Sequence, residues 1–133
     1  MVFFKWTKDL ELGFKKIDEQ HKQFIGIINR AYEAKLDKDK KIGNEILNEL
    51  IEFTRVHFTT EEKYFEKCNY SGAGEHIAEH IKLTEKVLRF KDNFDSGKCN
   101  CGEFLEFLKE WVEKHLKTMD KKYVETLKEC GVK

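Results

Sequence analysis

The stretch IGNEILNELIEFTRVHFTTEEKYFEK, residues 42–67, indicates a long helix with one inward face. Residues three or four apart along it form a single stripe: Ile46, Leu50, Phe53, His57, Glu61 and Tyr64. An α-helix has about 3.6 residues per turn, so this spacing places the six side chains on one face. The stretch therefore predicts a helix of about seven turns whose inner face packs against other helices.

Three further segments have the same periodicity. The helices that they predict span residues 18–36, 75–94 and about 104–129. In the first, Asp18 is the expected N-cap, and the inner face carries His21, Phe24, Ile28 and Tyr32. Short polar connections separate the helices at residues 37–41, 69–74 and 95–102.

Four helices joined by short connections pack most simply as antiparallel neighbours. We therefore predict an all-α, up-down-up-down antiparallel four-helix bundle with an N-terminal extended arm. The length of 133 residues is typical of one domain, so residues 1–133 are expected to form a single domain. The sequence contains no proline, the residue that interrupts helix interiors, and this favours the same fold.

The overall composition disfavours several classes of function. Lys and Arg together number 25, as do Asp and Glu, so no net charge attracts nucleic acid. Charged residues make up 38% and the mean hydropathy is -0.66, which disfavours a membrane span. The N-terminus lacks the pattern of an export signal, so we expect a cytoplasmic protein and free thiols. The cysteines are Cys68, Cys99, Cys101 and Cys130.

All five histidines fall on the stripes assigned to the bundle interior. They are His21, His57, His76, His80 and His115. One buried histidine is usually a core residue with a single hydrogen-bond partner. Five neutral imidazoles together need more donors and acceptors than aliphatic helices supply, whereas a shared metal centre satisfies them all.

The spacing of these side chains supports a metal centre. His76 and His80 are four residues apart, as are His57 and Glu61, so each pair lies on one face of its helix. His115 and Asp120 are five apart, about 140° out of alignment in a regular helix. Both side chains can therefore act as ligands only if they bind two different metal atoms or if the helix is locally distorted. An Asp120 carboxylate that bridges two metal atoms meets the first requirement.

Five imidazoles and two carboxylates are too many ligands for one tetrahedral zinc ion, and their mixture suits iron or manganese. Two octahedral ions offer twelve coordination positions. If both carboxylates and an oxygen bridge are shared by the two ions, these ligands and the five imidazoles fill about eleven positions, and about one stays open. An open position among aromatic side chains suits a small uncharged diatomic ligand. Trp111 and Phe107 lie four and eight residues before His115, so both are expected to line this ligand pocket and exclude water.

Together these residues form a pattern that resembles the hemerythrins, most closely the stand-alone bacterial ones. The pattern comprises Trp6, Leu10, Gly13, Ile17-Asp18-Glu19-Gln20-His21, His57-Phe58-x-x-Glu61-Glu62, His76-x-x-x-His80 and Trp111-x-x-x-His115-x-x-x-x-Asp120. It covers nearly the whole chain in order. The family also uses the His-x-x-x-x-Asp spacing that is awkward for a regular helix.

The resemblance implies a cofactor of two iron ions, Fe2+ or Fe3+, joined by an oxo or hydroxo bridge. His76, His80 and His115 would hold the saturated iron, and His21 and His57 the iron with the open position. Glu61 and Asp120 would bridge the two. The implied function is reversible dioxygen binding for carriage, storage or delivery rather than enzymatic turnover. Nitric oxide is a second candidate ligand, and we expect a monomer with no nucleic-acid partner.

Two other classes of function compete with this one. Di-iron oxidases and ferroxidases use carboxylate-rich sites with paired Glu-x-x-His motifs, which this sequence lacks at the required places. A sensor would pass the binding of oxygen or nitric oxide to a partner. No second domain is predicted to receive that signal, so a sensor would need a partner on another chain.

Overall fold

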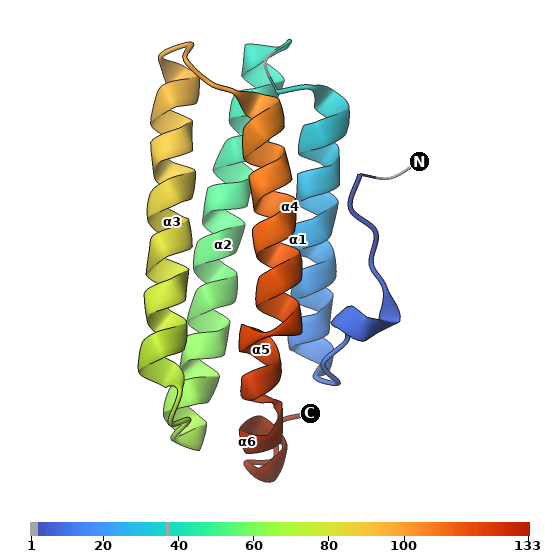
Figure 1. Cartoon of the computed structure of the whole chain (residues 1–133), viewed down its shortest axis with the longest axis vertical. Helices are drawn as coiled ribbons and strands as arrows, with labels where there is room; N and C mark the ends of the chain where they lie inside the picture. The colour runs from blue at the N-terminus through green and yellow to red at the C-terminus, as the bar shows by residue number, and fades with distance from the viewer. Residues whose placement is uncertain (1–2, 37) are drawn as a thin grey trace.

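Four long helices lie side by side and alternate in direction, which confirms the predicted antiparallel bundle (Figure 1). The structure is a computed structural model that describes residues 3–36 and 38–133, and no strand occurs within these ranges. The long helices are α1 (Lys15–Ala34), α2 (Lys40–Cys68), α3 (Ala73–Asp95) and α4 (Cys101–Lys117). No helix in the described part of the chain is both long enough and apolar enough to cross a bilayer.

The start of α1 differs from the prediction, because Asp18 is not its N-cap. The helix begins three residues earlier, after Phe14 in an extended conformation. The Asp18 carboxylate instead accepts hydrogen bonds from the backbone N–H groups of Leu12 (2.8 Å) and Gly13 (3.0 Å). Gly13 has a φ of 93°, which glycine adopts without steric cost. Asp18 thus fixes the turn through which the arm enters the bundle.

An N-terminal arm precedes α1 and includes the short 3-10 helix η1 (Lys8–Leu10). The Asn29 side chain of α1 accepts from the backbone N–H of Phe4 (2.7 Å) and donates to its carbonyl (2.8 Å). Phe4 and Leu10 are buried in the core. Tyr32 was predicted to face inwards but is 49% exposed, and its ring stacks on Phe3 of the arm. The arm therefore covers the outer side of α1.

The fourth helix does not continue to residue 129 as predicted. It ends at Lys117, and the short helices α5 (Met119–Lys122) and α6 (Val124–Glu129) follow. Thr118, at the junction, has φ -118° and ψ -73°, and its hydroxyl donates to the Lys114 carbonyl (2.7 Å). This break changes the direction in which the side chains after it point.

The prediction of free thiols is wrong, because the structure pairs the cysteines. One disulfide joins Cys68 at the end of α2 to Cys130 after α6, and the other joins Cys99 to Cys101. The sequence separations are 62 and 2 residues. Loop-closure entropy predicts a stabilisation of about 4 kcal/mol for the longer ring and about 2 kcal/mol or less for the shorter one. Only the first therefore has an evident role in holding the fold.

A second, smaller hydrophobic cluster explains why α2 and α6 meet. It lies beyond the main core of the bundle and consists of Leu12, Phe14, Ile17, Phe65, Tyr123 and Leu127. These residues come from the arm, from α1 and α2, and from the segment after Thr118. Their burial packs residues 119–132, the C-terminal segment, against the end of the bundle, where Cys130 reaches Cys68.

Candidate metal centre

All the side chains predicted as metal ligands meet in the interior of the bundle. They come from every long helix and from α5, and none is more than 7% exposed. They are His21, His57, Glu61, His76, His80, His115 and Asp120. The helix break at Thr118 is the local distortion that the five-residue step from His115 to Asp120 required.

The Glu61 carboxylate lies between histidines of three helices. Its Oε1 is 3.5 Å from His57 Nε2, 3.2 Å from His80 Nε2 and 3.9 Å from His76 Nε2. Its Oε2 is 3.9 Å from His21 Nε2. The carboxylate of Glu61, on α2, thus faces ring nitrogens of α1, α2 and α3.

The Asp120 carboxylate has a similar position, with its two oxygens facing different histidines. Its Oδ1 is 3.0 Å from both His76 Nε2 and His115 Nε2. Its Oδ2 is 3.2 Å from His21 Nε2. Each of the two carboxylates therefore faces two sets of imidazoles, as a bridging ligand must.

The ligand atoms fall into two compact groups that share Glu61. The first contains Glu61, His76, His80 and His115, and the second His21, His57 and Glu61, with the atoms of each group within 4.8 Å of one another. Two groups of this size match the donor sets of two neighbouring cations rather than one.

Buried polar atoms without partners test whether cations fit the site. Among the described residues, the buried side-chain atoms that lack a hydrogen bond belong, apart from one on Asn44, to the predicted ligands. They include His21 Nε2, His80 Nε2, Glu61 Oε1 and both oxygens of Asp120. Such groups are costly to bury unpaired, and metal coordination would satisfy them. The donor set therefore fits a pair of cations.

Comparison with known proteins agrees with this geometry. Residues 12–127 match the family model described as "Hemerythrin HHE cation binding domain". The chain belongs to the hemerythrin family. It is 32% identical to a bacteriohemerythrin of Clostridium acetobutylicum, over 92% of this chain and 99% of that protein. It is 28% identical to a bacteriohemerythrin of Pseudomonas aeruginosa, over 96% of this chain and 84% of that protein.

The hemerythrin fold is equally clear in three dimensions. A crystal structure of wild-type hemerythrin superposes with a TM-score of 0.87 at 25% identity, covering 94% of this chain and 98% of that one. The crystal structure of a hemerythrin mutant superposes with a TM-score of 0.89, also at 25% identity, covering 96% of this chain and 98% of that one. The predicted bundle and the family resemblance are thus both confirmed.

Two residues of the hemerythrin pattern to which the sequence assigned no role orient imidazoles of this centre. His57 Nδ1 lies 2.7 Å from Gln20 Oε1, and Gln20 Nε2 donates to Thr60 Oγ1 (3.3 Å). His80 Nδ1 lies 3.0 Å from Glu62 Oε2. These contacts leave each Nε2 pointing into the site. The available signal was position: Gln20 precedes His21, and Glu62 follows Glu61.

Tyr123 is a third contributor that sequence reasoning missed. Its hydroxyl, buried in the second cluster, donates to Glu61 Oε2 (2.6 Å). Burial, together with the nearby carboxylates of Asp120 and Glu61, raises the pKa of the Tyr123 phenol well above its ordinary value. The phenol therefore keeps its proton and holds one oxygen of Glu61 in place.

In the hemerythrin site, the electrostatics favour a neutral imidazole at His57 and an ionised carboxylate at Asp120. Burial lowers the pKa of His57 to about 4, against the opposing influence of Glu61. Burial alone would raise the pKa of Asp120, but His115, His21 and His76 hold it well below its usual range. Metals bind these same protonation states, neutral imidazole and carboxylate anion.

A small cavity of about 10 Å³ adjoins His21 and His57. Its lining consists of His21, Phe24, His57, Phe58, Trp111, Val112, His115, Leu116 and Asp120. The Trp111 ring stacks on the His115 imidazole, with centroids 4.3 Å apart. A cavity of this size holds about one water-sized molecule.

Phe107 does not line this cavity, contrary to the prediction. Its ring instead lines an outer groove, where Lys86 Nζ lies 4.2 Å from the ring centroid. Phe107 is two turns from His115, or about 12 Å along the helix, which is too far to reach the ligand pocket. Phe24 and Phe58 line the pocket in its place.

Proposed function

We propose that this protein binds dioxygen reversibly at a centre of two iron ions and serves in oxygen carriage, storage or delivery. The observation that supports this most is the convergence of five buried imidazoles and two shared carboxylates beside a cavity of molecular size. Membership in the hemerythrin family supports the same interpretation. Iron suits a mixture of imidazole and carboxylate donors.

The proposed ligand sets follow the two groups in the structure. His76, His80 and His115 would hold one iron, and His21 and His57 the other. Glu61 and Asp120 would bridge the pair, because each of these carboxylates faces histidines of both groups. The side with only two histidines has the lower coordination, and both of these line the cavity, whereas only His115 of the other group does.

The side chains around the cavity favour binding over turnover. Two ferrous ions would supply the electrons that dioxygen takes up and gives back. Trp111, Phe58 and Leu116 cover the cavity with apolar surface, which keeps bulk water and its protons away. The small size and apolar lining of this cavity suit a diatomic gas such as dioxygen or nitric oxide better than an organic substrate.

The decisive experiment combines metal analysis with oxygen titration. The purified protein should contain two irons per chain. After anaerobic reduction, air should produce a visible absorption band that disappears when oxygen is removed, over repeated cycles. One iron or none per chain would overturn the proposal. So would consumption of oxygen to water, which would indicate an oxidase.

Two variants test the ligand assignment. Glu61→Ala should lower the content of both irons, because it removes a shared ligand. His21→Ala should weaken chiefly the iron beside the cavity and leave about one iron bound. Full and equal metal content in both variants would contradict the assignment.

A further inference from the structure

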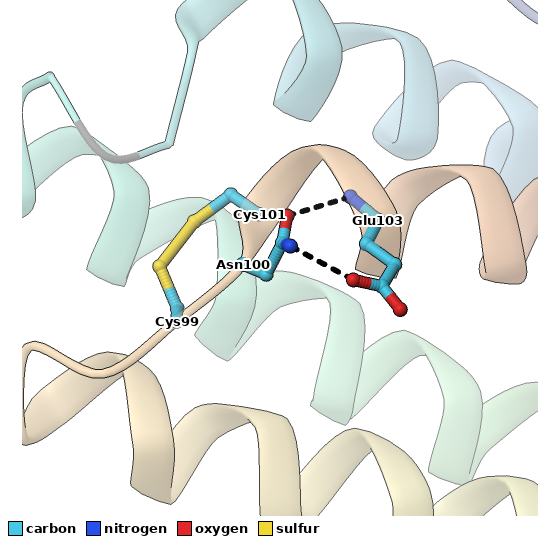
Figure 2. Close-up of a disulfide and its surroundings, with 4 residues drawn as sticks. All are labelled: Cys99, Asn100, Cys101 and Glu103. Carbon is cyan, nitrogen blue, oxygen red and sulfur yellow. Dashed lines mark hydrogen bonds between the residues drawn. A yellow bond between two sulfur atoms is a disulfide. The ribbon is translucent and has the colours of Figure 1, made fainter.

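The second disulfide lies away from the metal centre and has no role in the proposed function. Cys101 is the first residue of α4, and Cys99 lies two residues before it, separated by Asn100 (Figure 2). The metal ligands His115 and Asp120 lie at the other end of the same helix and just beyond it (Figure 1). The pair therefore forms a separate chemical site.

This disulfide is not needed to hold the start of α4. Asn100 and Glu103 form a reciprocal cap, shown in Figure 2. The Asn100 side chain accepts from the Glu103 backbone N–H (3.1 Å) and donates to the Glu103 carboxylate (2.8 Å). A three-residue ring also restrains the unfolded chain far less than the ring closed by Cys68 and Cys130. The bond can therefore open without loss of the helix end.

The two sulfurs differ in access and in surroundings. Cys99 is partly exposed, whereas Cys101 is 7% exposed and packs in the main core. An attacking thiolate therefore reaches Cys99 Sγ, and Cys101 is the leaving group. Cys101 leaves at the N-terminus of a 17-residue helix, where the backbone N–H groups stabilise a thiolate.

A groove beside the disulfide indicates the charge of the attacking molecule. It has a volume of about 440 Å³, and Lys98 and Asn100, the neighbours of Cys99, form part of its wall. The complete lining is Lys86, Arg89, Phe90, Asn93, Lys98, Asn100, Glu103, Phe104 and Phe107. Its cationic side chains are those of Lys86, Arg89 and Lys98. Its one carboxylate, that of Glu103, accepts a hydrogen bond from Asn100. The groove therefore favours an anionic thiol.

We propose that Cys99 and Cys101 form a thiol–disulfide exchange site for anionic thiols. A first thiolate attacks Cys99 Sγ, the Cys99–Cys101 bond breaks, and Cys101 leaves as a thiolate. A second thiolate attacks the substrate sulfur of the mixed disulfide and releases Cys99. Two substrate thiols thus become one disulfide and lose two electrons and two protons. Cys99 and Cys101 take up these electrons and protons and become thiols.

The test uses the intact oxidised protein with two small thiols. These are 2-mercaptoethanesulfonate, which is anionic, and cysteamine, which is cationic, at equal thiolate concentration. Alkylation and peptide mass measurement follow each disulfide separately. The Cys99–Cys101 pair should be reduced at least about tenfold faster than Cys68–Cys130. The sulfonate should react faster than cysteamine, and high salt or Lys98→Glu should remove that preference.

Two matched variants test which sulfur is attacked. Cys101→Ser leaves Cys99 free, and it should form a mixed disulfide readily with the disulfide of 2-mercaptoethanesulfonate. Cys99→Ser leaves the buried Cys101, which should react at least about tenfold more slowly. Circular dichroism and iron content should be unchanged in both, because neither residue belongs to the metal centre. Equal reduction rates for the two disulfides, equal rates for the two thiols, or equal reactivity of the two variants would overturn the proposal.

Discussion

The residues that orient the imidazoles are neighbours in sequence of other ligands. Gln20, which contacts His57, precedes His21, and Glu62, which contacts His80, follows Glu61. Two consecutive residues of a helix point about 100° apart, so one side chain reaches into the site while the next reaches the outer edge of a facing ring. The helices that carry Gln20 and Glu62 therefore each supply a ligand and also fix a ligand of a neighbouring helix.

This arrangement predicts that Glu62→Ala weakens metal binding by about 10- to 100-fold, because the His80 ring loses the partner of its Nδ1. Competition with a chelator of known affinity measures the change. Glu66→Ala is the matched control, since Glu66 is exposed on the same helix. Similar affinity in the two variants would show that Glu62 does not position His80.

The buried His57 should make the metal-free protein sensitive to mild acid. In the unfolded chain its imidazole takes a proton below a pH of about 6.5, but in the folded protein its pKa is about 4. Between these values the unfolded state binds more protons, so the free energy of unfolding decreases as the pH falls from 6.5 towards 4. The contribution of His57 is about 3 kcal/mol.

Urea denaturation of the metal-free protein at several pH values measures this effect. His57→Gln is the matched variant, and its free energy of unfolding should fall less over the same range. His80 has a raised pKa and acts in the opposite direction, but it does so in both proteins and cancels in the comparison. Parallel pH profiles would exclude His57 as the cause.

Trp111→Ala should accelerate oxidation of the reduced, oxygen-exposed protein, because it opens the cavity beside His21 and His57 to water. Loss of the optical band of the oxygenated protein over time measures the rate. Phe107→Ala removes an aromatic side chain of the same helix that lies outside the cavity, and it should leave the rate unchanged. An unaltered rate in Trp111→Ala would remove the protective role.

At the scale of the elements, the C-terminal segment determines whether the site is complete. Asp120 lies on the short helix α5, which follows the break at Thr118, and Tyr123 comes directly after that helix. Asp120 contacts His21 and His76, and Tyr123 contacts Glu61, yet neither residue belongs to a long helix. The disulfide from Cys68 to Cys130 and the second hydrophobic cluster hold this segment in place.

Cys130→Ser should therefore destabilise the protein by about 4 kcal/mol and accelerate loss of metal to a chelator. Urea denaturation and the rate of iron release measure the two effects. Cys101→Ser removes the other disulfide and should cost about 2 kcal/mol or less, with iron release unchanged. Equal iron release from both variants would show that the longer ring does not secure the centre.

For the molecule as a whole, the sequence predicted what periodicity and residue type determine. The spacing of apolar and histidine side chains indicated four helices and a buried cluster of ligands, because a helix repeats every 3.6 residues. It could not give the end of α4 or the exposure of Tyr32, which depend on contacts with the C-terminal segment and the arm. Gln20 and Glu62 belong to the family pattern, but their contacts with His57 and His80, like that of Tyr123 with Glu61, depend on how the helices pack.

The disulfides show a different limit of sequence reasoning. Cys68 and Cys130 are 62 residues apart, and only the packing of α6 against α2 brings them together. The missing export pattern predicts free thiols, but it carries no information about which cysteine side chains lie close together. Three-dimensional proximity was the missing information.

Removal of metal should lower the stability of the entire bundle, since the ligands come from all four long helices. Binding to the folded state alone adds about 4 kcal/mol at a free metal concentration about one thousand times the Kd. Thermal unfolding of the loaded and chelator-treated protein measures the difference. An unchanged Tm would show that the interior is stable without cations, and that the site binds them weakly.

The two carboxylates of the site are anchored unequally, one on a long helix and one on a short helix. Glu61 lies well inside a 29-residue helix, and it cannot move unless that helix unwinds. Asp120 lies on a four-residue helix that the Cys68–Cys130 disulfide and the second hydrophobic cluster hold in place. When ions enter or leave, we therefore expect the Asp120 side of the site to loosen before the four-helix frame does.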